Sequence, residues 1–143
     1  MSPICGSLGP MSHLNWNINP KAMRELYRIA KPIAVFSGKA AMVQIRKGLY
    51  FPQEQPHPTA LYDENPWPGI FQFGMVEQIS YNRCIADSAV LTGPNKVIRI
   101  KNHSSIVTNS PESALLFKKL LCNGLHSQMK GNAKHLEDAE IWT

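Results

Sequence analysis

The sequence predicts an α+β domain in which antiparallel β-meanders pack on two or three helices. A helix with clear end signals covers residues 19–31, and a second helix signal begins at residue 110. Short apolar or alternating runs follow the first helix and recur over residues 88–107. With 143 residues, of which 43% are hydrophobic, the chain is long enough for one folded domain with a sizeable core.

The helix over residues 19–31 has both a start and a stop signal. The side-chain oxygen of Asn19 is a good acceptor for the free N–H groups of a first helical turn. Pro20 fits the first helical position, where no N–H donor is needed. Pro32 disfavours helical geometry at Lys31, so we expect the helix to end there.

This helix has two unlike sides. The side expected to pack on the domain consists of Met23, Leu26, Tyr27 and Ala30. The opposite side is a basic stripe of Lys21, Arg24, Arg28 and Lys31. Glu25 alone interrupts the positive charge, and a stripe of this kind suits a phosphate backbone. The alternative is a solvated charged surface without a partner.

Short strands are expected on both sides of this helix. We expect strands at residues 13–18, 33–36, 41–46 and 49–51, the last three joined in a small antiparallel meander.

Residues 52–69 hold five of the eleven prolines, which excludes continuous secondary structure over most of the segment. A short strand at residues 59–62 is expected only at a sheet edge. The segment either binds a partner or ligand, or is a loop that only connects its neighbours. Trp67 is a candidate exposed ring for base stacking, with packing as the alternative.

The second half of the chain predicts further strands and helices. Residues 70–73 are expected to form a strand and residues 75–86 a second helix, with Arg83 as its only cation. The runs at residues 89–91, 96–101 and 104–108 predict a three-stranded meander. Ser110 and Pro111 repeat the capping signal, and predict a third helix over residues 113–123.

Composition limits the classes of function. The net charge of +5 favours a polyanionic partner. No apolar run reaches the roughly 20 residues that span a bilayer, and residues 1–14 lack the basic and apolar regions of a signal peptide. We therefore expect no membrane partner and a cytoplasmic location, in a host cytoplasm if the protein is viral. The widely spaced Cys5, Cys84 and Cys122 indicate reduced thiols rather than disulfides or a zinc site.

No pattern of residues indicates catalysis. The five histidines are dispersed, and the sequence contains no metal-binding motif, nucleophile elbow or phosphate-cradling glycine loop. We therefore expect no metal, no cofactor and no catalytic residue. A small enzyme or ligand-binding domain remains an alternative. It would use His57, Asp63 or Cys84, and it requires these three side chains to converge on one pocket.

Residues 89–117, AVLTGPNKVIRIKNHSSIVTNSPESALLF, resemble part of one domain of a phage-type DNA polymerase sliding clamp. The shared pattern is a strand, a short turn, an isoleucine-rich strand, a serine-containing turn and a third strand. A proline and an acidic residue follow this last strand. Residues 14–48 resemble the amphipathic helix and first strands of such a domain. In clamps, helices line the inner wall of a ring and face DNA without reading bases.

The resemblance implies a processivity factor that works with a polymerase or another replication protein. Clamp subunits carry two or three such domains, whereas this chain has room for one. The resemblance therefore implies either that copies assemble as a homo-oligomer or that the chain is a shortened relative. By the resemblance, the residues that face the duplex are Lys21, Arg24, Arg28, Lys31 and Arg83.

The leading hypothesis is therefore a non-catalytic protein that binds nucleic acid independently of sequence, with duplex DNA as the expected partner. The main alternative is a structural or assembly protein, for example a viral one, that acts through protein–protein contacts. The expected organisation is a flexible N-terminal segment (1–13), an α+β domain (14–109), and a C-terminal helix with a polar tail (110–143).

Overall fold

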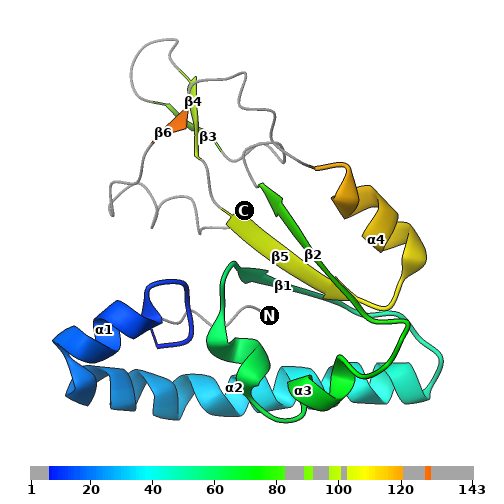
Figure 1. Cartoon of the computed structure of the whole chain (residues 1–143), viewed down its shortest axis with the longest axis horizontal. Helices are drawn as coiled ribbons and strands as arrows, with labels where there is room; N and C mark the ends of the chain where they lie inside the picture. Colours follow the sequence, from blue (N-terminus) through cyan, green and yellow to red (C-terminus); the bar gives the residue numbers. More distant parts are fainter. Residues whose placement is uncertain (1–6, 83–88, 92–96, 101–102, 121–127, 130–143) are drawn as a thin grey trace.

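The computed structural model of the chain describes residues 7–82, 89–91, 97–100, 103–120 and 128–129 (Figure 1). The class is α+β, as predicted, with helices and two three-stranded sheets. The elements in chain order are α1 (Ser12–Ile18), α2 (Pro20–Arg46), β1 (Pro52–Pro56), the 3₁₀ helix η1 (Ala60–Asp63), α3 (Trp67–Ile70), β2 (Glu77–Asn82), β3 (Ala89–Leu91), β4 (Val97–Ile100), β5 (His103–Thr108), α4 (Pro111–Lys118) and β6 (Gln128–Met129).

Helix α2 begins where the sequence predicts and ends much later. The side chain of Asn19 accepts a hydrogen bond of 3.1 Å from the Ala22 N–H, and Pro20 is the first helical residue. Pro32 lies inside the helix instead of ending it, so α2 extends over 27 residues. At a rise of 1.5 Å per residue this gives a length of about 40 Å. The strands predicted at residues 33–36 and 41–46 are therefore wrong, because both runs are helical.

Packing explains why the helix continues past Pro32. The proline removes one main-chain donor, and its ring is exposed to solvent. Beyond it, Ala34, Gly38 and Ala41 are buried at helical spacing against the rest of the domain. The burial of this face stabilises helical geometry over residues whose local pattern also suits a strand.

Five other expected elements have a different structure. Residues 12–18 form helix α1 rather than a strand, residues 60–63 form η1, and Ile70 ends helix α3. No strand is assigned at residues 49–51. The helix predicted over residues 75–86 is strand β2 in its described part, because Ile79 and Tyr81 alternate toward one buried side.

The main sheet has the order β1-β5-β2 and is antiparallel throughout. Ile106 in the central strand lies opposite Glu54 of β1 and Ile79 of β2. The predicted three-stranded meander is only partly correct: β3 pairs with β4, but β5 belongs to the main sheet and β4 pairs in parallel with β6. The proline-rich β1 occupies a sheet edge, where a missing N–H does least harm.

The main sheet separates two hydrophobic clusters. On one side Val107 joins the larger cluster with α2, η1 and α3, which includes Leu61, Trp67 and Ile70. On the other side Ile106 and Ile79 pack with Ala114 of α4. Figure 1 shows α2 along the lower side of this sheet and α4 beside β2.

Side-chain hydrogen bonds fix the ends of these elements. Asn109 accepts from the Phe51 N–H and donates to the Leu49 carbonyl, both at 2.9 Å, which holds the start of β1 beside the end of β5. Ser110 caps α4 as predicted, since its hydroxyl oxygen accepts from the Ser113 N–H. The helix predicted over residues 113–123 spans Pro111–Lys118, and residues 121–123 lie outside the described ranges.

Part of the segment expected to be loose is packed. Leu8 lies in the larger hydrophobic cluster, and its carbonyl accepts hydrogen bonds from the hydroxyl of Thr59 and the N–H of Ala60. Ser7 is also buried. Residues 7 and 8 are therefore integrated into the domain core.

Within the residues that the structure describes, no helix combines the length and the apolar character required to cross a membrane.

Candidate nucleic-acid interface

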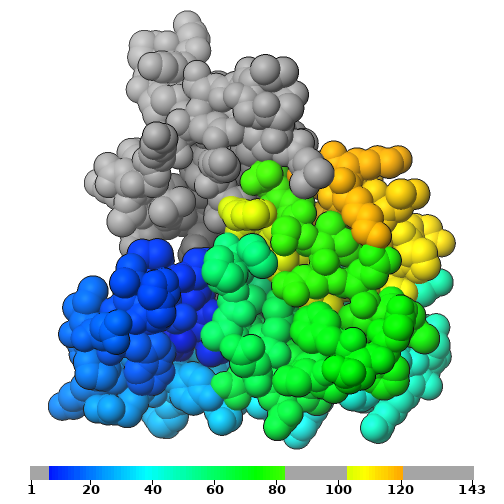
Figure 2. Space-filling view, in the orientation of Figure 1, coloured from blue at the N-terminus to red at the C-terminus, as the bar shows by residue number. Residues whose placement is uncertain are grey.

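The core face of α2 is its buried side, formed by Met23, Ala30, Ala34, Gly38 and Ala41. Small side chains dominate this face, so the segment containing η1 and α3 approaches the helix closely. In Figure 2 this segment (green) lies in front of the middle of α2, which follows the lower margin of the view. The predicted packing side is thus correct for Met23 and Ala30 and partly for Tyr27, whereas Leu26 is 39% exposed.

Trp67 anchors this contact. Its side chain is fully buried, and its indole N–H donates a hydrogen bond of 3.1 Å to the main-chain carbonyl of Ala34. A Cβ at Gly38 would lie 3.1 Å from the indole nitrogen and 2.7 Å from Cδ of Pro66. The suggestion that Trp67 is exposed for base stacking is therefore wrong, and its ring belongs to the core.

The basic face of α2 lies on another side of the helix and is longer than the sequence indicates. All of its side chains are exposed, including the four predicted ones and two more from the second half of the helix. The basic face consists of Lys21, Arg24, Arg28, Lys31, Lys39 and Arg46. Lys39 and Arg46 were missed because Pro32 was expected to end the helix.

Two members of the basic face have acidic partners. Arg28 is 3.2 Å from Glu25, and both side chains are largely exposed, so this pair contributes little to stability. Lys31 is 3.6 Å from Glu64, and its ammonium group lies 5.3 Å from the centre of the Tyr27 ring. Lys31 is thus turned toward the domain, while Arg28 remains at the surface.

The contacts around Lys31 alter two pKa values. Tyr27 donates a hydrogen bond to Glu64, which raises the pKa of the Tyr27 hydroxyl, and burial adds to this effect. Hydrogen bonding with Tyr27 and then the charge of Glu64 raise the pKa of Lys31. Lys31 therefore keeps its charge to a higher pH than an isolated lysine, but a phosphate would have to compete with Glu64 for it.

The other four basic side chains are better placed for a ligand. Within the described part of the chain, no ion pair involves Lys21, Arg24, Lys39 or Arg46. A phosphate meeting one of these side chains displaces water and counterions only. The predicted Arg83 lies outside the described residues, and the helix expected to present it is strand β2 where it is described.

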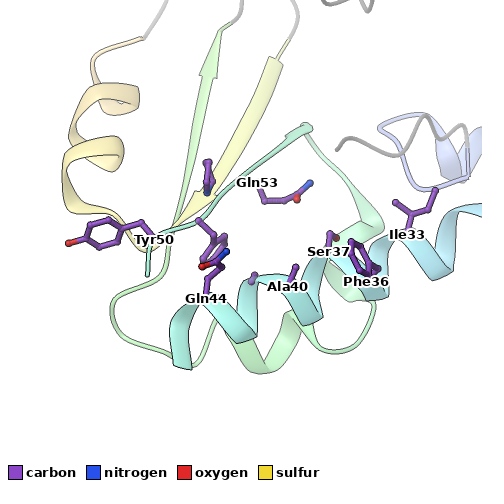
Figure 3. Close-up of a pocket in the computed structure, with 10 residues that line it drawn as sticks. Ile33, Phe36, Ser37, Ala40, Gln44, Tyr50 and Gln53 are labelled. Atoms are coloured by element: carbon purple, nitrogen blue, oxygen red, sulfur yellow. The ribbon is translucent and has the colours of Figure 1, made fainter. Parts of the chain in front are cut away.

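A third side of α2 is apolar and faces solvent. We call it the apolar seam, and it consists of Leu26, Ile29, Ile33, Phe36, Ala40 and Val43. Ile29 and Phe36 are 60% and 62% exposed. The seam borders a half-open hollow of about 260 Å³ between α2 and the residues at the start of β1. Figure 3 shows Phe36 and Ala40 on the helix, with Tyr50 and Gln53 on the opposite side of the hollow.

The residues of the enzyme alternative are not brought together in the described structure. The ring of His57 lies 5.2 Å from that of His103, whereas Asp63 is an exposed residue at the end of η1. Cys84 lies outside the described residues, as do Cys5 and Cys122. Among the described residues, no group of three or more His, Cys, Asp or Glu side chains is arranged to hold a metal ion.

Comparison of the chain with protein-family models, with curated proteins and with solved structures finds no match.

Proposed function

We propose that this protein is a non-catalytic nucleic-acid-binding protein that contacts the phosphates of duplex DNA through the basic face of α2. The supporting observation is the row of six exposed basic side chains along one helix of 27 residues. Glu25 and Glu64 pair with Arg28 and Lys31, whereas the other four cations have no acidic partner among the described residues, so most of the positive charge of this face is retained.

The chemistry of the basic face suits phosphates rather than bases. Lys and Arg side chains that neutralise phosphates release condensed counterions, which drives binding without regard to sequence. Base readout requires side chains held in a groove with directed donors and acceptors. The side chains of Lys21, Arg24, Lys39 and Arg46 extend into water, so we expect them to position the duplex rather than to read it.

The narrower proposal is a sliding-clamp-like replication factor that assembles as a homo-oligomer and works with a polymerase. It rests on the resemblance of residues 89–117. The second resembling segment, residues 14–48, supports it less, because α2 is helical to Arg46 where the clamp pattern has strands. Phosphate binding by the basic face does not depend on this narrower role.

The test is the affinity of the full chain for two unrelated DNA duplexes, measured by fluorescence anisotropy between about 50 and 200 mM salt. We expect similar affinities for both duplexes. We also expect the logarithm of the binding constant to fall linearly with the logarithm of salt, with a slope of roughly −3.6 to −5.4 for about four to six phosphate contacts. A flat response, or no binding at the lowest salt, would overturn the proposal.

The apolar seam favours a second candidate, a structural protein that acts by assembly. Light scattering of the chain with and without DNA separates the two candidates. Stable assembly together with indifference to DNA at low salt supports the assembly role alone.

A further inference from the structure

The apolar seam has the spacing of a helix–helix contact. Its residues follow one another at alternating intervals of three and four positions from Leu26 to Val43. This is the pattern by which two helices pack side by side, each apolar side chain lying among residues of the facing helix. A helix on the surface of a domain needs only one apolar side, and the core face already supplies it.

The exposure of the seam supports a second packing partner. Leu26, Ile29, Phe36 and Val43 are 39%, 60%, 62% and 48% exposed. Single exposed apolar residues are common, but a continuous row on one helix indicates an interaction site. The hollow beside Ile33 and Phe36 gives room for side chains that approach from outside the domain.

The seam is complementary to itself when two copies of α2 lie antiparallel. Each residue then lies opposite a seam residue of the second copy, with the twofold axis between Ile33 and Phe36. The facing pairs are Leu26 with Val43, Ile29 with Ala40, and Ile33 with Phe36. The small side chain of Ala40 faces the larger, branched side chain of Ile29, so the two together can fill the space between the helices.

Charge favours the antiparallel arrangement over the parallel one. Glu25 and Arg46 flank opposite ends of the seam on the same side. In an antiparallel pair each Glu25, which also contacts Arg28 of its own helix, lies beside Arg46 of the other copy, which gives two symmetric ion pairs across the contact. A parallel pair would instead leave Glu25 of both copies at one end and Arg46 of both copies at the other, so these ion pairs could not form.

We infer that α2 is the contact between two copies of this chain, packed antiparallel through the apolar seam. Because the core faces of the two helices lie on one side of such a pair, both basic faces lie on the other side and form one larger cationic surface. The inference depends on the seam and its flanking charges, and it stands whether or not the protein binds nucleic acid.

The first experiment is sedimentation velocity of the full chain over a concentration series. We expect a reversible dimer, and we expect Phe36→Glu or Ile29→Glu to give the monomer mass. Leu116→Glu is the matched control, because Leu116 is 59% exposed on α4 and should leave the dimer intact. Circular dichroism confirms that the variants remain folded. A parent chain that stays monomeric, including one whose seam is covered by another segment of the same chain, overturns the inference.

The second experiment tests the direction of packing. Glu25→Arg alone and Arg46→Glu alone should each raise the dimer dissociation constant, roughly 2- to 30-fold for two exposed pairs, and the double variant should restore it. With the native cysteines replaced by serine, a mixture of Ile29→Cys and Ala40→Cys chains should form the mixed disulfide. Failure of the double variant to recover, or disulfides only between identical chains, contradicts the antiparallel arrangement. A dimer that is indifferent to the seam variants rules out this surface altogether.

Discussion

The indole nitrogen of Trp67 lies 3.1 Å from the main-chain oxygen of Ala34, to which it donates a hydrogen bond in the buried centre of the domain. This bond joins the proline-rich segment to the middle of α2. It connects the helix that carries the basic face to the segment that packs in front of it. The position of the basic face therefore depends on this contact.

Replacing Trp67 by Phe should lower the free energy of unfolding by about 1–3 kcal/mol, because it removes this hydrogen bond and leaves part of the indole volume empty. Urea denaturation monitored by circular dichroism measures the change. Trp16→Phe is the control, since Trp16 is only partly buried and should cost less. Equal effects of the two substitutions would contradict the anchoring role of Trp67.

Gly38→Ala should destabilise the protein by about 1–3 kcal/mol through overpacking. The new methyl group would lie 2.7 Å from a ring carbon of Pro66, closer than packed atoms allow. Gly69→Ala is the matched control, because no atom lies within 4 Å of the Cβ position there. Thermal unfolding of both variants is the measurement, and a Gly38→Ala chain as stable as the control would show that α3 does not approach α2 so closely.

Pro32→Ala should stabilise the protein by about 1–3 kcal/mol, because alanine restores a main-chain donor within α2 and suits a helix interior. Pro32 is exposed, so its ring contributes little packing that would be lost. The change in the urea midpoint and the helical circular dichroism signal measure this effect. A destabilised variant would mean that α2 does not continue through this position.

Stability should decline above about pH 10, where tyrosine ionises in an unfolded chain. Burial and then the charge of Glu54 raise the pKa of Tyr62, and the hydrogen bond to Glu64 raises that of Tyr27. A folded-state pKa above the unfolded value gives stability that is complete below the unfolded pKa. That stability is lost as the pH rises through the folded pKa.

Urea midpoints measured at intervals from about pH 8 to pH 11 show this decline directly. Tyr62→Phe should flatten it, because the group that resists ionisation is removed. Tyr50→Phe is the control and should leave it unchanged, since that ring is 62% exposed. If the decline is the same in all three chains, Tyr62 is not the group responsible.

The parts of this fold that depend on local chemistry could be predicted from the sequence. Asn19 and Ser110 cap helices because their side-chain oxygens reach N–H groups within three residues. The side of α2 that includes Met23 and Ala30 is buried as its spacing predicts.

The parts that depend on distant partners were not predicted. Pro32 does not end α2, because the tertiary contacts of Ala34, Gly38 and Ala41 outweigh the local signal. Gly38 is needed because Pro66 and Trp67 approach it, and both lie nearly thirty positions later in the chain. Strand β5 was assigned to its neighbours in sequence, whereas it pairs with β1, about fifty positions earlier, as in Ile106 with Glu54.

Because the helix was predicted to end at Lys31, the predicted interface was also too short. Once the helix is taken to end at Lys31, the cations Lys39 and Arg46 and the apolar residue Phe36 cannot be assigned to its surface. Reading the three-and-four spacing across Pro32, from Ile29 through Ile33 to Phe36, is the signal by which the longer helix could have been found.

The most direct test of the proposed function compares three double variants in duplex DNA binding over a salt series. They are Lys21→Gln/Arg24→Gln, Lys39→Gln/Arg46→Gln, and, as the control, Lys118→Gln/Lys119→Gln, which removes two exposed cations at the C-terminal end of α4, one of them paired with Glu77. We predict that each α2 pair lowers the affinity and reduces the salt slope by about 2, since each lost phosphate contact removes about 0.9. The α4 control should keep the affinity and slope of the parent. Parent-like binding by both α2 variants would contradict the claim that the basic face of α2 binds phosphates.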